Sequence, residues 1–216
     1  MRILVACEYS QVVCTAFRNK GHEAYSCDIL PCEGGLPEWH IQDDVLKHLD
    51  DGWDMMIAHP PCTHLAVSGA AWFKNKVVGQ KQALEFVKVL MNADIEKICI
   101  ENPVSVISSR IKKPSQIIHP WQFGHMEQKT TCLWLKNLPR LKPTKVVHDQ
   151  MMLLQKRERE RNHYCSPGPD RWKIRSRTYQ GIAYAMADQW GNKELLEKYI
   201  ERDLFEQLNE TLTREE

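Results

Sequence analysis

The hydrophobic positions of this chain alternate between short apolar runs and longer stretches with helical spacing. The short runs predict strands within residues 2–10, 22–30, 53–61 and 95–103. Helical spacing occurs within residues 11–21 and 76–94, and residues 43–52 predict a short helix or turn. Strands that alternate with helices indicate right-handed βαβ units and a mainly parallel sheet covered on both faces. The pattern therefore predicts an α/β fold.

Polar side chains occupy the carboxyl ends of the four predicted strands. They are Cys7 with Glu8, Asp28, His59 to Cys62, and Glu101 with Asn102. In open sheets of this kind, ligands bind where loops leave the carboxyl ends of the strands. Each residue alone is compatible with a helix cap or a turn, which Asp and Asn often form. Their joint placement favours an active site over a bare scaffold at this edge of the sheet.

The most distinctive of these strand ends is the Pro-Pro-Cys stretch. Each proline fixes its φ and lacks a backbone donor, so Pro60 and Pro61 end the strand and hold the next residues in one rigid path. A reactive thiol at Cys62 fits this setting, because a carboxylic acid such as Glu101 can donate a proton as a thiolate adds. A stiff loop with an incidental cysteine is an equally open interpretation. A Cys-His hydrolase is also open, with a histidine drawn from His59, His64 or His125.

Length and composition narrow the class of protein. The chain has 216 residues, of which 43% are hydrophobic and 26% charged, as in a soluble globular protein with one core or a main domain and a small appendage. No apolar run approaches membrane-spanning length, and the start reads as a strand, so we expect a cytoplasmic protein without a membrane partner. The eight cysteines form no C-x-x-C pair, so we expect reduced thiols and no metal site.

The order of these motifs resembles the cytosine-5 DNA methyltransferase family. Pro60-Pro61-Cys62 and Glu101-Asn102-Pro103 match that family's Pro-Pro-Cys and Glu-Asn-Val motifs in order and in their place on consecutive strand ends. Weaker similarity occurs at residues 18–30, 43–49, 121–135 and 177–190. The resemblance implies a Rossmann-like methyltransferase fold that uses S-adenosyl-L-methionine (SAM), with a mainly parallel sheet and a small basic insert. Small phage-type members are the most similar.

The resemblance also implies a covalent mechanism on cytosine in DNA. Cys62 would add to carbon 6 of the base, Glu101 would hydrogen-bond and protonate ring nitrogen 3, and carbon 5 would take the methyl group of SAM. Asn102 would brace the Pro-Pro-Cys loop, because a small misplacement of reacting atoms costs orders of magnitude in rate. These three residues are the expected catalytic set.

A SAM site is implied at the other strand ends. Asp28 would bind the ribose hydroxyls and Asp44 the adenine amino group. The full expected set of cofactor-binding residues is Cys7, Glu8, Tyr9, Ser10, Asp28, Ile29, Asp44, Val45, Pro60 and Gly181. Residues 7–12 read CEYSQV where the family has Phe-x-Gly-x-Gly. Both glycines are therefore missing at a place where the backbone approaches the cofactor closely.

The expected DNA contacts lie in two parts of the chain. In the catalytic domain, residues 1–137 and 178–216, they are Pro61, Ser68, Lys129 and Thr131. Residues 138–177 stand as a reduced insert in place of a full target-recognition domain, and its expected contacts are Arg171, Lys173, Arg175 and Arg177. Basic and aromatic residues alternate around these four, which suits a surface that follows phosphates and stacks on bases. Residues 155–164 instead predict a solvated helix with i,i+4 charge pairs.

Two further functions stay open. The same chemistry could act on a free nucleotide or on single-stranded nucleic acid, since little protein is available to hold a duplex. The other is a non-catalytic relic of the fold that binds nucleic acid. The missing glycines favour this function, and intact Cys62 and Glu101 disfavour it.

A packing helix is predicted for the tail from its apolar residues Leu195, Leu196, Tyr199, Ile200, Leu204 and Leu208. The sequence carries no indication of the oligomeric state.

Overall fold

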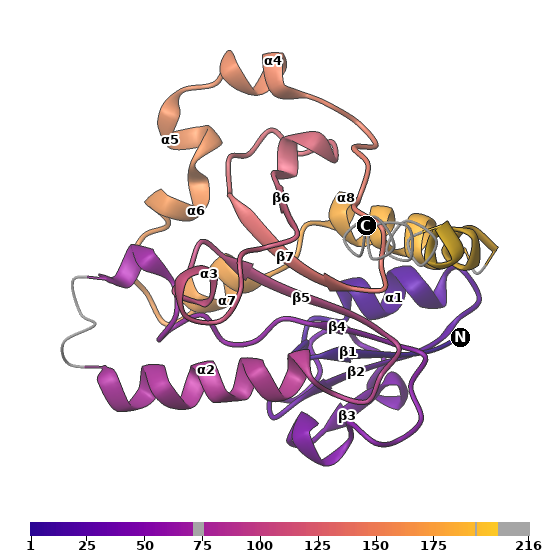
Figure 1. The fold of residues 1–216 in the computed structure, drawn as a ribbon. Helices are drawn as coiled ribbons and strands as arrows, with labels where there is room; N and C mark the ends of the chain where they lie inside the picture. Colours follow the sequence, from indigo (N-terminus) through magenta and orange to yellow (C-terminus); the bar gives the residue numbers. More distant parts are fainter. Residues whose placement is uncertain (71–75, 193, 203–216) are drawn as a thin grey trace, which may run out of the picture.

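The chain folds around one seven-stranded sheet. In the computed structural model, which describes residues 1–70, 76–192 and 194–202, the strand order is β3-β2-β1-β4-β5-β7-β6. The strands are β1 (Arg2–Ala6), β2 (Glu23–Asp28), β3 (His40–Gln42), β4 (Met55–Ala58), β5 (Lys97–Pro103), β6 (Gln116–Ile118) and β7 (Thr131–Lys136). Neighbouring strands among β1 to β5 are parallel, and β7 runs antiparallel to β5 and β6. The expected α/β, Rossmann-like fold with a mainly parallel sheet is confirmed (Figure 1).

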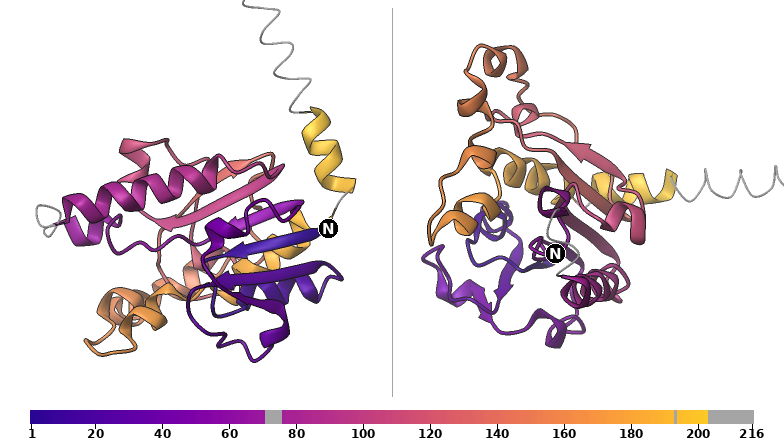
Figure 2. Two further views of the ribbon diagram at one scale, coloured as in Figure 1. Left: turned by 90° about the horizontal axis from the view of Figure 1, so that it is seen from below. Right: turned by 90° about the vertical axis from the view of Figure 1, so that its left-hand side faces the viewer.

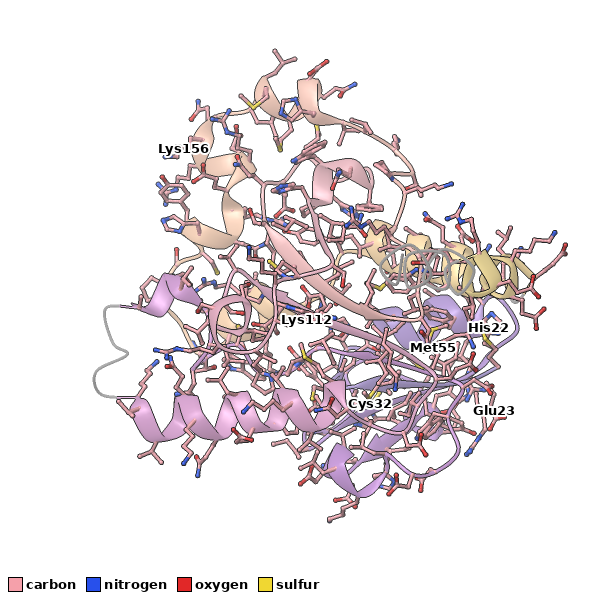
Figure 3. All side chains as sticks on the ribbon, viewed as in Figure 1. His22, Glu23, Cys32, Met55, Lys112 and Lys156 are labelled. Atoms are coloured by element: carbon pink, nitrogen blue, oxygen red, sulfur yellow. The ribbon has the colours of Figure 1, made fainter. Side chains whose placement is uncertain are left out.

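Helices cover both faces of the sheet. The layers are α1 (Val12–Arg18) with α8 (Gln180–Trp190) on one face and α2 (Val77–Met91) on the other, and α3 (Ile107–Arg110) follows β5. Successive strand residues point to opposite faces. Accordingly, Ile3 and Val5 pack in one cluster with α1 and α8, whereas Leu4 and Ala6 pack in a second cluster with α2. Met55, labelled in Figure 3, belongs to the first cluster. Covered on both faces, the central strands are apolar throughout.

The hydrophobic pattern did not predict β3, β6, β7 or α8, and two of these strands are short. β3 and β6 have three residues each, too few for hydrophobic periodicity to register. The segment 43–52 holds a single 3-10 turn at Val45–Lys47, in agreement with the predicted short helix or turn. Strand pairing, which depends on distant parts of the chain, decides whether such short segments become strands.

The expected basic insert contains four short helices. They are α4 (His148–Met152), α5 (Lys156–Arg159), α6 (Arg161–Tyr164) and α7 (Arg171–Ser176). We call α4 to α6 the arm; it stands away from the sheet, with Lys156 at its outer edge, while α7 returns to the body (Figures 1, 2 and 3). The solvated helix predicted at 155–164 is confirmed as exposed helix, but it is divided into α5 and α6 because Glu160 leaves the helical region at φ −105°, ψ 33°. Leu138 and Leu141, at the start of the insert, pack in the core.

Residues 194–202 form a further helix after α8. Leu196 is buried in the same cluster as Trp190, so a packing helix is confirmed there. Leu195 is half-exposed, and Leu204 and Leu208 lie outside the described residues. Within the described part of the chain, no helix combines the length and the apolar character needed to span a bilayer.

Candidate active site

The strand order reverses between β1 and β4, and open α/β sheets bind ligands at the carboxyl ends of the strands beside such a reversal. The register across β1, β4 and β5 places Cys7, His59 and Glu101 in one row. The His59 amide bonds the Ala6 carbonyl at 2.9 Å, which fixes the first residue after β4 against β1. The polar strand ends predicted from the sequence are therefore brought together at one edge.

The Pro-Pro-Cys loop is fastened to the end of β5. Asn102 is buried, and its Nδ2 donates to the Pro60 carbonyl at 2.8 Å. Downstream, the Cys62 carbonyl accepts from the amides of Leu65 and Ala66 at 3.0 and 2.9 Å. Because hydrogen bonds hold the loop on both sides of the thiol, Cys62 has one defined position. The Asn102 bond is the contact expected of a residue that braces this loop.

A buried acid and base lie beside the loop. The distance from His59 Nδ1 to Glu101 Oε2 is 3.1 Å, and the two side chains are 10% and 16% exposed. Burial raises the pKa of Glu101, but the hydrogen bond and charge of His59 outweigh burial and hold that pKa below its usual value. Burial alone would lower the pKa of His59. The nearby carboxylates of Glu101 and Glu8 outweigh the effect of burial, so the pKa of His59 is raised. Each side chain thus favours the charged form of the other, imidazolium and carboxylate.

The thiol of Cys62 is partly buried. Burial raises its pKa, and the carboxylate of Glu101 raises it further, whereas the positive charges of Lys129 and Arg175 lower it. Lys129 lies just before β7, and its Nζ donates to the Arg175 carbonyl at 3.1 Å. The approach to β7 and helix α7 thus bring two cations toward the thiol. Cys62 is protonated at rest, and these cations favour its ionisation.

The loop after β1 has a left-handed backbone without glycine. Cys7 has φ 59° and Gln11 has φ 56°, a region that L side chains disfavour at a cost of order 1–3 kcal/mol per residue. The Gln11 side chain holds this shape by donating to the Leu36 carbonyl at 2.8 Å and accepting from the Leu36 amide at 3.2 Å. Contacts with the β2–β3 connection therefore support a conformation for which the family uses glycine.

Glu8 has a different place from the expected one. It is buried, and its carboxylate accepts from the amides of Val13 and Cys14 at 2.7 and 3.1 Å. Ser10 lies against the same carboxylate, with its Oγ at 3.4 Å. The first amides of a helix lack partners within the helix, and Glu8 satisfies two of them in α1. The expectation that the Glu8 side chain binds a cofactor is corrected accordingly.

Three expected cofactor residues gather at the ends of β1, β2 and β3. Burial raises the pKa of the Cys7 thiol most, and the carboxylates of Asp28 and Asp44 raise it further, so both carboxylates lie near that thiol. Asp28 is partly buried and accepts from the Leu30 amide at 2.9 Å. Asp44 is exposed and accepts from the Leu46 amide at 3.0 Å, as the N-cap of the 3-10 turn.

The remaining expected residues of the catalytic domain have varied surroundings. Gly181 donates its amide to His125 Nε2 at 2.9 Å, and a Cβ there would lie 2.0 Å from the Phe123 carbonyl. Close packing at the start of α8 therefore accounts for this glycine. Thr131 is 3% exposed within β7, so we remove it from the expected base contacts. Exposed positions are held by Ile29, Pro61 and Ser68, while Val45 is buried.

Helix α7 lies against the loop after β1. The Tyr9 and Trp172 rings are 5.6 Å apart, and Tyr9 Oη is 3.4 Å from Ser176 Oγ. Tyr9 is buried, whereas Trp172 is 48% exposed. Figure 2 shows the insert beyond the carboxyl ends of the strands, on the side away from the N-terminus. The insert therefore borders both the expected cofactor loop and the Cys62 thiol.

Two of the four expected phosphate-binding cations are paired within the protein. Lys173 Nζ bonds Glu33, and Arg177 Nη2 lies 3.6 Å from the same carboxylate. Arg175 is exposed and near Cys62, and Arg171 is partly buried. Contact of all four with phosphate stays a prediction, but Lys173 and Arg177 share the single negative charge of Glu33 on the β2–β3 connection.

Sequence reasoning assigned no role to Gln11 or Glu33 and considered His59 only for a hydrolase. The position of His59 directly before Pro60 is a signal, because it places a titratable group at a strand end. Glu33 lies 140 residues from Lys173, so no local pattern links them. Contacts of this kind require the folded structure.

Comparison of the sequence with family models and with curated proteins gives no match. Among solved structures, the chain is similar to one from Escherichia coli described as a candidate DNA modification methyltransferase encoded within a prophage. The TM-score is 0.45 at 12% identity, over 68% of this chain and 51% of that one. The chain thus spans about half the length of that structure. Similarity at this level carries no argument about function. The function proposed below therefore rests on the site alone.

Proposed function

We propose that this chain is a SAM-dependent methyltransferase that transfers a methyl group to carbon 5 of cytosine in DNA through a covalent Cys62 adduct. The observation that carries the proposal is the Asn102 to Pro60 hydrogen bond, which joins the thiol loop to the strand end bearing Glu101. A rigid nucleophile beside a carboxyl group, at the reversal of an α/β sheet, is the arrangement that this reaction needs.

In the proposed reaction, Cys62 gives its proton to solvent and its sulfur bonds carbon 6 of the base. Lys129 and Arg175 favour the thiolate over the thiol. The electron pair of the carbon 5–carbon 6 double bond moves into the ring, and nitrogen 3 takes up a proton that reaches it through Glu101. Carbon 5 becomes nucleophilic as a result. After methylation, solvent water takes the carbon 5 proton, the carbon 5–carbon 6 double bond re-forms, and the cysteine leaves as a thiolate.

SAM would supply the electrophilic methyl group. Its ribose hydroxyls and adenine amino group are hydrogen-bond donors, and the carboxylates of Asp28 and Asp44 are acceptors placed together at the ends of β2 and β3. These side chains fit the cofactor. Glu8 is committed to α1, so the methionine end would meet the loop through its backbone and through Tyr9 and Ser10.

DNA is the proposed substrate because cations of the insert border the thiol. Arg175 and Lys129 are near Cys62, and the exposed face of Trp172 suits stacking on a base. The insert is too small for an ordinary recognition domain, so we expect relaxed sequence specificity and affinity that falls steeply with salt.

The test is trapping of the covalent adduct. DNA carrying 5-fluorocytosine, incubated with the protein and SAM, should give a complex that survives denaturing electrophoresis, because carbon 5 then lacks a removable proton. Cys62→Ala should form none. Cys165→Ala, which removes a partly exposed thiol outside the proposed site, should behave as the wild type.

Absence of an adduct in the wild-type protein, or its persistence in Cys62→Ala, would contradict the proposal. Efficient methylation of free deoxycytidine monophosphate, with weak activity on duplex DNA, would instead favour the nucleotide substrate. Binding of DNA without any methyl transfer would favour the third possibility, a non-catalytic nucleic-acid-binding protein.

A further inference from the structure

His59 has no role in the reaction described so far, yet it lies at its centre. It follows β4 directly, and its Nδ1 is 3.1 Å from Glu101 Oε2. The side chain is 10% exposed, and among the described residues nothing hydrogen-bonds its buried Nε2. A histidine held this firmly at the edge where ligands bind needs an explanation beyond packing.

The charged groups around His59 come from three elements. Glu101 on β5 and Glu8 after β1 raise its pKa, and Lys129 before β7 lowers it. The two carboxylates outweigh both Lys129 and the effect of burial, so the pKa of His59 is raised and the protonated ring is favoured. Glu101 is correspondingly held ionised by the same contact.

This arrangement presents a chemical problem for the proposed reaction. Nitrogen 3 of cytosine must gain a proton when sulfur adds to carbon 6, but an ionised Glu101 has no proton to give. Its carboxylate is nonetheless the group expected to face the base. A proton therefore has to reach Glu101 from a neighbour within hydrogen-bonding distance.

We propose that the His59 imidazolium is the proton source for Glu101, so that the two residues act as a relay to the base. This inference rests on the proposed function. As the sulfur–carbon 6 bond forms, the Nδ1–H bond of His59 breaks, Glu101 takes that proton, and the protonated carboxyl group then gives it to nitrogen 3 of the base. The imidazole is left neutral and the carboxylate ionised. The proton returns along the same path when the cysteine is expelled and nitrogen 3 loses it.

The kinetic test uses His59→Asn, in which the amide can still donate to Glu101 but cannot release a proton. We expect kcat to fall by about 100-fold or more, the usual contribution of a positioned acid, with KM for DNA and SAM unchanged. The wild-type rate should decline at high pH, where the imidazolium is lost, and this decline should be absent in His59→Asn. His22→Asn is the control, since His22 lies at the edge away from the insert (Figure 3).

A second measurement does not depend on turnover. In the wild-type protein, the pKa of His59 followed by nitrogen NMR should lie above about 6.5, the ordinary histidine value, and should fall in Glu101→Gln. A wild-type pKa below that value would overturn the relay. So would unchanged kcat and pH profile in a folded His59→Asn protein. If the wild type forms no fluorocytosine adduct, the proposed function fails, whereas an adduct together with normal His59→Asn kinetics refutes only the relay.

Discussion

The thiol loop and helix α7 border the same edge of the sheet but are held in different ways. The loop is fixed by a buried side-chain hydrogen bond from Asn102 and by backbone bonds at Cys62. Helix α7 is held by an aromatic contact at Trp172 and by ion pairs of Lys173 and Arg177 with one carboxylate. Exposed ion pairs contribute little to stability and weaken with salt, unlike a buried hydrogen bond.

This difference suits two tasks. Covalent chemistry needs reacting groups held within a fraction of an ångström, which a buried network at strand ends provides. A surface that binds DNA of varied sequence needs charge and adaptability instead. The arm is linked to the body in a similar way to α7, since Glu127 pairs with Arg161 and accepts from the Tyr179 hydroxyl at 2.8 Å.

The largest effect should come from loosening the thiol loop. Asn102→Ala removes the bond to Pro60, so we expect a rate loss of about 100-fold from misplacement of Cys62. The fold should lose about 1–3 kcal/mol, because a buried carbonyl is left without its donor. Single-turnover methylation and urea unfolding measure the two effects.

Asn92→Ala is the matched control for that variant, because Asn92 is exposed at the end of α2. It should keep both rate and stability. A normal rate in Asn102→Ala would show that the loop is held without this bond and would remove the contrast with α7.

An intermediate effect is expected at the cofactor carboxylates. Asp28→Ala and Asp44→Ala should each weaken SAM binding by about 1–3 kcal/mol, the cost of unmatched hydroxyl or amino donors. Asp44→Ala should also reduce stability, since it caps the 3-10 turn through Leu46. Calorimetric titration with SAM and thermal unfolding separate the two losses.

Asp188→Ala, on α8, serves as the control and should bind SAM normally. Unchanged affinity in both Asp28→Ala and Asp44→Ala would show that the cofactor residues implied by the family resemblance do not apply to this chain, whatever Cys62 does.

The smallest effect should distinguish the cations of the insert from one another. Removing Arg175 should lower DNA affinity and reduce the salt slope by about 1, the value for one lost phosphate contact. Removing Lys173 or Arg177 should change both less, because the two already share the negative charge of Glu33. Fluorescence anisotropy over a range of salt concentrations measures the slope.

Glu33→Gln sharpens this comparison, because it frees Lys173 and Arg177 and should raise DNA affinity. Glu38→Gln, on the same connection, is its control and should leave affinity unchanged. Equal losses from all three cationic variants would show that the ion pairs with Glu33 do not limit DNA binding.

The α/β class and the edge that carries the chemistry follow from the sequence. Apolar runs of strand length, prolines that end a strand and polar residues directly after it are local signals, and each depends on a few neighbouring positions. For this reason the strands predicted within residues 2–10 and 95–103 are confirmed, and local patterns suffice to place Cys62 and Glu101 at one edge of the sheet.

Only the tertiary structure decided how those side chains are used. Glu8 turns inward to cap α1, Glu33 binds cations from a helix far along the chain, and the carboxylates of Glu101 and Glu8 raise the pKa of His59. Each outcome depends on which distant groups come within hydrogen-bonding range and on the loss of water around them. Burial and long-range pairing set those charges, and neither is encoded in the residue types of a local segment.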